Sequence, residues 1–236
     1  MEIKYFLIHD KLVEFSWPPI ISEDILEKLN QVTVYLQNAY GEGIKEIRKG
    51  YHTLSLRLHV SISEQDCRDL VEEFKMLDAR SLDHSAKTWH IPVAYGKAFG
   101  KDLSLLAKIH DLAEEEIIKR HSAGIYVLHF YGFLPGFMYL GGLDPVLFTP
   151  RKSKPDRQMS KGSVAIGGHQ TGIYPMESPG GWYAIGKCPI TLFDIKREPA
   201  VQLQVGDRIR FEPIDADSFE AIYQLAVQGK YDLRHD

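Results

Sequence analysis

The sequence predicts an α+β protein in two parts, a small α/β domain over residues 1–88 and a strand-rich domain over residues 89–236. Two observations support this division. Helical and alternating apolar periodicities intermix in the first part, whereas after Gly124 short apolar runs are separated by glycine, proline and aspartate. The polar segment 77–89 is expected to link the two parts. With 236 residues, 44% of them hydrophobic, the chain can bury a core in each part.

Strands and amphipathic helices alternate in the first part. Extended runs are expected within 5–17, and two strands within 44–60, where leucines alternate with polar residues. One helix is expected after Ser22, which can cap it, with apolar residues at helical spacing until Gly41, and a second helix is expected after Ser63. This order of elements predicts a small sheet with helices on one face.

A strand at 89–95 and two short helices are expected to open the second part. The first helix spans 102–110, and the second starts at Asp111, where Glu114 would complete a capping box.

Short strands separated by turn residues are expected to fill the rest of the second part, an arrangement typical of a β-barrel or a β-sandwich. They include runs at 190–194 and 200–205. A last helix is expected over 215–229, with its apolar side chains on or near one face.

The composition argues against several classes of function. The net charge of −4 leaves no basic excess for a phosphate backbone, so nucleic acid is not expected as a partner. Cys67 and Cys188 form neither a disulfide framework nor a zinc motif, and the histidines lack metal-ligand spacing, so no metal site is expected. No secretory signal and no run long enough to span a membrane are found, so the expected location is the cytoplasm.

Large rings alternate with glycine and proline in GFLPGFMYL (132–140) and GIYPMESPGGW (172–182). Stiff turns that carry rings and a few polar groups are typical of binding pockets, although each single ring fits core packing equally well. No nucleophile motif occurs, so the catalytic residue is left unassigned. The residues expected to form a substrate-binding or partner-facing pocket are Pro135, Phe137, Tyr139, Arg151, His169, Gln170, Tyr174 and Trp182. Truncation of Tyr174 or Trp182 is expected to impair activity more than folding.

Longer motifs resemble a known family. GFLPGFMYLGGLDP, KGSVAIGGHQTGIYPMESPGGWYAIGK and VGDRIRFEPI are similar to the B subunit of the bacterial 5-oxoprolinase. This family is also labelled allophanate hydrolase subunit 1 and includes the inhibitor of a sporulation histidine kinase. The resemblance implies a small ferredoxin-like α/β domain over 1–88 and a cyclophilin-like β-barrel over 89–236.

The resemblance further implies a subunit of an ATP-dependent 5-oxoprolinase, which hydrolyses 5-oxo-L-proline to L-glutamate together with an A-type subunit and a carboxyltransferase-like C-type subunit. ATP would be used by the complex, because this chain has no nucleotide motif, and the isolated chain is expected to be inactive. The alternative is a binding module that inhibits autophosphorylation of a sensor histidine kinase.

The chain departs from the family pattern in one loop. Asp156 stands where the family carries an arginine, and Met159, Ser160 and Lys161 replace Val-Pro-Ala. If the family arginine binds a carboxylate, Asp156 would repel it, and Arg151 or Arg157 would have to act instead.

Overall fold

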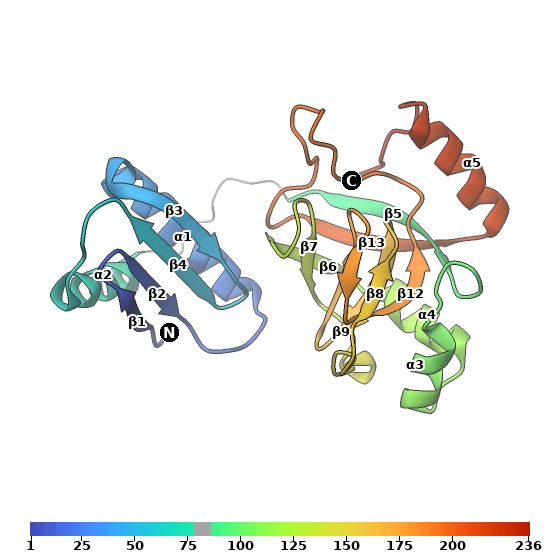
Figure 1. Cartoon of the computed structure of the whole chain (residues 1–236), viewed down its shortest axis with the longest axis horizontal. Coiled ribbons are helices and arrows are strands. Elements are labelled where there is room, and N and C mark those ends of the chain that lie inside the picture. Colours follow the sequence, from blue (N-terminus) through green and yellow to red (C-terminus); the bar gives the residue numbers. More distant parts are fainter. Residues whose placement is uncertain (78–85) are drawn as a thin grey trace. The chain divides into compact units, whose positions relative to one another are not determined.

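The computed structural model describes residues 1–77 and 86–236, which form an α+β protein with two compact units (Figure 1). The units are Met1–Ser85 and Ala86–Asp236, so the division falls three residues before the expected boundary at 88/89. Most of the expected linker, 78–85, lies outside the described residues. Among the described residues, no helix combines the length and the apolar character that crossing a bilayer requires.

A four-stranded antiparallel sheet and two helices make up the N-terminal unit. The sheet order is β1-β2-β4-β3, and helix α1 connects β2 to β3 across the intervening β4. A crossover that skips one strand of the sheet in this way is typical of ferredoxin-like folds. The edge strand beside β2 is β1, the first strand in the chain. The elements are β1 (Lys4–His9), β2 (Leu12–Ser16), α1 (Glu23–Tyr40), the short 3₁₀ turn η1 (Gly41–Gly43), β3 (Ile44–Lys49), β4 (Thr53–Leu58) and α2 (Glu64–Met76).

Local sequence signals explain these elements. Leu54 and Leu56 are both buried on one face of β4, as their period-2 spacing predicts. Helix α2 begins after Ser63 as expected, and a capping box forms there: the Ser63 hydroxyl accepts from the Asp66 N–H at 3.2 Å, and the Asp66 carboxylate accepts from the Ser63 N–H at 2.8 Å. Ser22 precedes α1 as expected, but its side chain makes no capping hydrogen bond.

Seven strands close into a barrel in the C-terminal unit, which confirms a barrel over a sandwich. The order is β10-β7-β6-β13-β5-β12-β9, and pairing of β9 with β10 closes the ring. The barrel strands are β5 (Thr88–Tyr95), β6 (Tyr126–Tyr131), β7 (Met138–Gly141), β9 (Ser163–Gly167), β10 (Gln170–Ile173), β12 (Tyr183–Lys187) and β13 (Arg208–Ile214).

Helices and a second small sheet lie outside the barrel wall. Figure 1 shows α3 (Leu103–His110) and α4 (Glu114–Ala123) in green and α5 (Ala216–Val227) in red around the strands. β8 (Asp156–Met159) and β11 (Ser178–Gly180) form a separate two-stranded sheet.

Three details of the second unit differ from the expectations. The helix expected from Asp111 begins at Glu114 with Ala113 as its N-cap and no capping box, because Asp111 ends α3 in the left-handed region at φ 52°. Runs 190–194 and 200–205 form no strand and share only the isolated bridge between Phe193 and Val201. They are loops, from which Ile190 and Leu203 still reach the core. In α5, Phe219 is buried, whereas Tyr223 and Leu225 are exposed.

A buried polar network crosses the barrel core at His121 of α4. The His121 Nε2 lies 2.8 Å from the Thr171 hydroxyl, which itself donates to the Ala165 carbonyl, and the Nδ1 lies 2.8 Å from the Tyr95 hydroxyl. Because the Thr171 proton is already used, His121 donates from Nε2 and accepts from Tyr95 at Nδ1. This pattern requires a neutral imidazole.

We expect acid to destabilise the protein through its buried histidines. Burial lowers the pKa of His121 from 6.5 to about 3 and that of His129 to about 4. Between pH 6.5 and these values the unfolded state binds more protons, so the free energy of unfolding falls as the pH falls, by at most about 1.4 kcal/mol per pH unit for each histidine. Urea unfolding from pH 7 to pH 4 measures this slope. His121→Gln should show a shallower slope, and an unchanged slope would contradict the assignment.

Candidate functional site

Aromatic side chains from loops and one strand line a cavity of about 260 Å³ on the outside of the barrel, which we call the aromatic pocket. The loop between β6 and β7, strand β7 itself, the loop before β8, the residue that follows β10, and the segment from β11 to β12 all contribute to it. The lining residues are Phe133, Phe137, Tyr139, Arg151, Pro155, Tyr174, Pro179, Gly180, Gly181 and Trp182.

Interlocked rings form the floor of the aromatic pocket. The Phe137 ring centroid lies 5.2 Å from that of Tyr174 and 5.4 Å from that of Trp182, both edge to face. Such pairs fix ring orientation in addition to burying apolar area. The three rings are only 1–4% exposed and form a small apolar cluster of their own, with Met159 and two alanines. The floor of the pocket is therefore rigid.

Two glycines allow the rings to lie where they do. A Cβ at Gly180 would stand 2.3 Å from the Tyr174 hydroxyl oxygen, and a Cβ at Gly167 would stand 2.4 Å from Cδ1 of the Trp182 indole. Only glycine permits these approaches without movement of a buried ring.

Phe133 stands at the mouth of the pocket in a strained conformation. Its φ is 62°, a region that bulky residues rarely occupy, and its ring is 61% exposed. The turn that carries it is closed by hydrogen bonds from the Phe137 N–H to the Leu134 carbonyl and from the Gly132 N–H to the Phe137 carbonyl. Strain combined with an exposed ring is a signature of a binding site rather than of core packing.

Arg151 is the one charged residue among the described residues that line the pocket. Its guanidinium carbon lies 5.8 Å from the centroid of the Trp182 ring, and its charge opposes the rise that burial causes in the pKa of Tyr139. None of the ion pairs found in the described part of the chain involves Arg151. A planar cation without a counterion there, set over aromatic rings, is suited to bind a carboxylate or phosphate.

The carboxylate of Asp156 is neutralised by lysines and does not line the pocket. The Lys152 Nζ lies 2.7 Å from Asp156 and 2.8 Å from Asp102, and the Lys101 Nζ lies 2.9 Å from Asp156. Burial alone would lower the pKa of Lys152, but its hydrogen bonds to Asp102 and Asp156 have the larger effect, so the pKa lies above its usual value. This ion cluster anchors the loop that presents Arg151, and the expected repulsion of an anion by Asp156 is therefore offset.

The two tyrosines of the pocket are hydrogen-bond donors at neutral pH. Burial raises the pKa of Tyr174 to about 12, and burial likewise raises that of Tyr139, with Arg151 opposing the shift. Both phenols therefore stay protonated and cannot serve as general bases. The described lining offers a cation and hydroxyl groups but no nucleophile or ionised acid.

The structure brings together five of the eight residues expected to form a pocket: Phe137, Tyr139, Arg151, Tyr174 and Trp182. Pro135 is exposed at the tip of the turn and does not line the cavity. His169 stacks on Phe148 at the far end of β10, and Gln170 lies beside it, with its Oε1 buried and without a partner among the described residues. An extended strand rises about 3.3 Å per residue, so His169 lies roughly 16 Å along the chain from Tyr174. Pro155 is a lining residue without a sequence signal of its own.

Burial changes what truncation of the rings should do. Tyr174 is 2% exposed and Trp182 is 4% exposed, so Trp182→Ala should lower the free energy of unfolding by about 3–5 kcal/mol. Loss of activity and loss of stability should therefore run in parallel, unlike the expectation drawn from the sequence. Urea unfolding beside an activity assay measures both, and a stable but inactive Trp182→Ala variant would contradict the packing role.

Comparisons with known proteins identify the family. The carboxyltransferase domain, subdomain C and D, matches residues 3–203. The chain is 42% identical to the B subunit of 5-oxoprolinase from Bacillus subtilis over 154 residues, which are 65% of this chain and 64% of that protein. It is 37% identical to the B subunit of 5-oxoprolinase from Haemophilus influenzae over 207 residues, which are 86% of this chain and 94% of that protein.

A solved structure supports the fold alone. The urea amidolyase of K. lactis matches 99% of this chain with 16% of its own, at a TM-score of 0.81 and 16% identity. The chain thus belongs to the family of the carboxyltransferase domain, subdomains C and D, in which its curated relatives are 5-oxoprolinase B subunits.

Proposed function

We propose that this chain is a non-autonomous subunit of an ATP-dependent 5-oxoprolinase, which hydrolyses 5-oxo-L-proline to L-glutamate together with A-type and C-type subunits. The observation that supports this most is Arg151, which has no carboxylate partner among the described residues and lies at the edge of a small aromatic pocket. 5-Oxoproline is a small ring that bears one carboxylate. Its ring would lie on the aromatic floor while the guanidinium binds its carboxylate.

The composition of the pocket supports a site that a partner completes. Opening a lactam requires activation of an unreactive amide, which ATP would supply in the complex. The described lining offers binding groups but neither a base nor a nucleotide-binding motif. Phe133, exposed at the mouth, presents an apolar ring that a companion chain would cover.

The test is reconstitution. The purified chain should release no glutamate from 5-oxoproline and ATP, whereas the chain mixed with its A-type and C-type partners should release glutamate and ADP. Omitting ATP or this chain from the mixture should abolish product. ATP-dependent glutamate release by the chain alone would overturn the composite site, and an inactive complete mixture would overturn the proposed reaction.

Inhibition of a sensor histidine kinase stays an alternative prediction, favoured by the exposed Phe133 ring, which suits protein contact. An autophosphorylation assay with the purified kinase distinguishes the two functions. Inhibition that Phe133→Ser abolishes and Arg151→Ala leaves intact would favour the binding module.

A further inference from the structure

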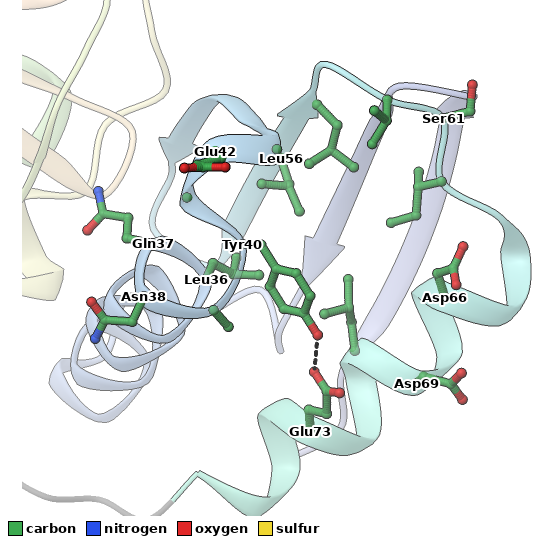
Figure 2. A pocket seen from close by; sticks show the side chains of 17 residues that line it. Leu36, Gln37, Asn38, Tyr40, Glu42, Leu56, Ser61, Asp66, Asp69 and Glu73 are labelled. Carbon is green, nitrogen blue, oxygen red and sulfur yellow. Dashed lines mark hydrogen bonds between the residues drawn. The ribbon is translucent and has the colours of Figure 1, made fainter.

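A second cavity, about 830 Å³ in volume, lies in the N-terminal unit, apart from the residues of the aromatic pocket. Figure 2 shows it between the C-terminal end of α1 with η1 on one side and α2 on the other. We call it the acidic groove. Its described lining comprises Leu36–Gly43, Leu56, Leu58, Val60–Ile62, Asp66, Asp69, Leu70 and Glu73.

The base of the acidic groove is apolar. Leu36 of α1 and Leu56 of β4 are fully buried beneath it, and Leu70 of α2 closes one side. Val60 lines the groove and is 62% exposed, and Tyr40 is also exposed at the edge. An open apolar surface of this kind, rimmed by polar residues, marks an interaction site.

The rim of the acidic groove is negatively charged. Asp66, Asp69 and Glu73 follow one another along α2, and Glu42 lies on η1 across the groove from this helix (Figure 2). No lysine or arginine occurs among the described lining residues. Arg68, on the same helix, instead contacts Tyr5 and Gln65 and does not line the groove.

The end of α1 adds to the negative potential. Its last turn, at Gln37–Tyr40, lines the groove and contains no basic residue that would offset the partial negative charge of a helix C-terminus. Hydrogen bonds from Ser63 lower the pKa of the Asp66 carboxyl, so this group stays ionised at neutral pH. Glu73 accepts hydrogen bonds from the hydroxyls of Tyr35 and Tyr40, which fixes one carboxylate at the rim.

We propose that the acidic groove binds a basic amphipathic segment of a partner polypeptide, whose apolar side chains pack on Tyr40, Leu58 and Val60 and whose lysine or arginine side chains pair with the carboxylate rim. Charge complementarity selects the cationic partner, because the four rim carboxylates have no basic counterpart in the described lining. The apolar base selects a polypeptide over a small cation, since a volume of about 830 Å³ holds several apolar side chains. The groove is separate from the aromatic pocket, so the proposal stands whether or not the proposed reaction is correct.

Fluorescence anisotropy of the full-length chain with two synthetic peptides tests the proposal. The probe is a helical peptide with leucines on one face and lysines flanking them, and its counterpart carries glutamate in place of each lysine. We expect saturable binding of the lysine peptide, weakened by salt, and no binding of the glutamate peptide. A third peptide with serine in place of each leucine should bind at least about tenfold more weakly, a difference of about 1.4 kcal/mol.

Variants locate the binding. The double variant Glu42→Lys/Asp69→Lys reverses two exposed charges that make no capping contact, and it should weaken binding of the lysine peptide about tenfold. Val60→Asp should also weaken binding of this peptide, because it places a charge on the apolar surface. Glu72→Lys/Glu220→Lys changes the net charge by the same amount at exposed positions outside the groove and should bind like the unmodified chain.

Several outcomes would overturn the proposal. They are absence of binding by the lysine peptide, equal binding of the lysine and serine peptides, and equal weakening by the control variant. Displacement of the peptide by spermidine at a similar concentration would replace the proposal with a small-cation site. If a groove variant fails to fold, as its thermal melt would report, the comparison of the three peptides on the unmodified chain decides alone.

Discussion

Arg151→Ala is expected to lower the kcat/KM of the reconstituted enzyme for 5-oxoproline about 100-fold, with most of the change in KM. A charge-assisted hydrogen bond contributes about 1.5–3 kcal/mol, and its loss should act on substrate binding. The residue is exposed and pairs with no carboxylate among the described residues, so only its contact with the Trp182 ring is lost and the melting temperature should fall only slightly. Steady-state glutamate release beside a thermal melt measures both quantities.

Two further variants sharpen this test. Arg151→Lys keeps the charge but not the planar fork, so it should recover only part of the activity. Arg157→Ala removes an exposed arginine from the adjoining strand β8, outside the pocket, and it should behave like the unmodified chain. Equal losses from Arg151→Ala and Arg157→Ala would show that only the general charge of the loop matters.

Gly167→Ala is expected to produce a large loss of stability, about 3 kcal/mol. The new Cβ would stand 2.4–2.7 Å from three atoms of the Trp182 indole, which is buried and cannot rotate away freely. Overpacking of this kind typically costs about 1–3 kcal/mol, and here it should also displace the floor of the aromatic pocket. Urea unfolding gives the change in free energy.

The adjacent glycine supplies a matched control. A Cβ at Gly168 meets nothing within 4 Å, so Gly168→Ala should cost only the strain of its positive φ, about 1–2 kcal/mol. If the clash with Trp182 is the cause, the loss in Gly167→Ala/Trp182→Ala should fall well short of the sum of the single losses. Additive losses would contradict this explanation.

Local patterns predicted most of the fold. The alternating leucines of β4 and the start of α2 after Ser63 are encoded within a few residues of sequence, and the structure confirms both. The predicted start of α4 was wrong. Asp111 and Glu114 fit a capping box in sequence, but in the structure Asp111 adopts the left-handed conformation that ends α3. The sequence alone could not decide between these two uses of one residue.

Features that depend on strand register and distant contacts were predicted less well. Tyr174 and His169 are neighbours in sequence, but an extended β10 carries them to opposite ends, and only Tyr174 reaches the aromatic pocket. The acidic groove had no sequence signal, because its carboxylates come from η1 and α2 and each alone fits a solvated surface. Burial of Trp182 likewise depends on a distant residue, Gly167 of β9, which leaves room for the indole.

Substrate discrimination by the reconstituted enzyme tests the carboxylate role of Arg151 most directly. The measured quantity is the ratio of kcat/KM for 5-oxoproline to that for its neutral carboxamide, 5-oxoprolinamide, with the unmodified chain and with Arg151→Gln. If the guanidinium binds the carboxylate, the ratio should be large for the unmodified chain and should fall at least about tenfold in the variant. An equal ratio for both chains would contradict the assignment of the aromatic pocket as the substrate site.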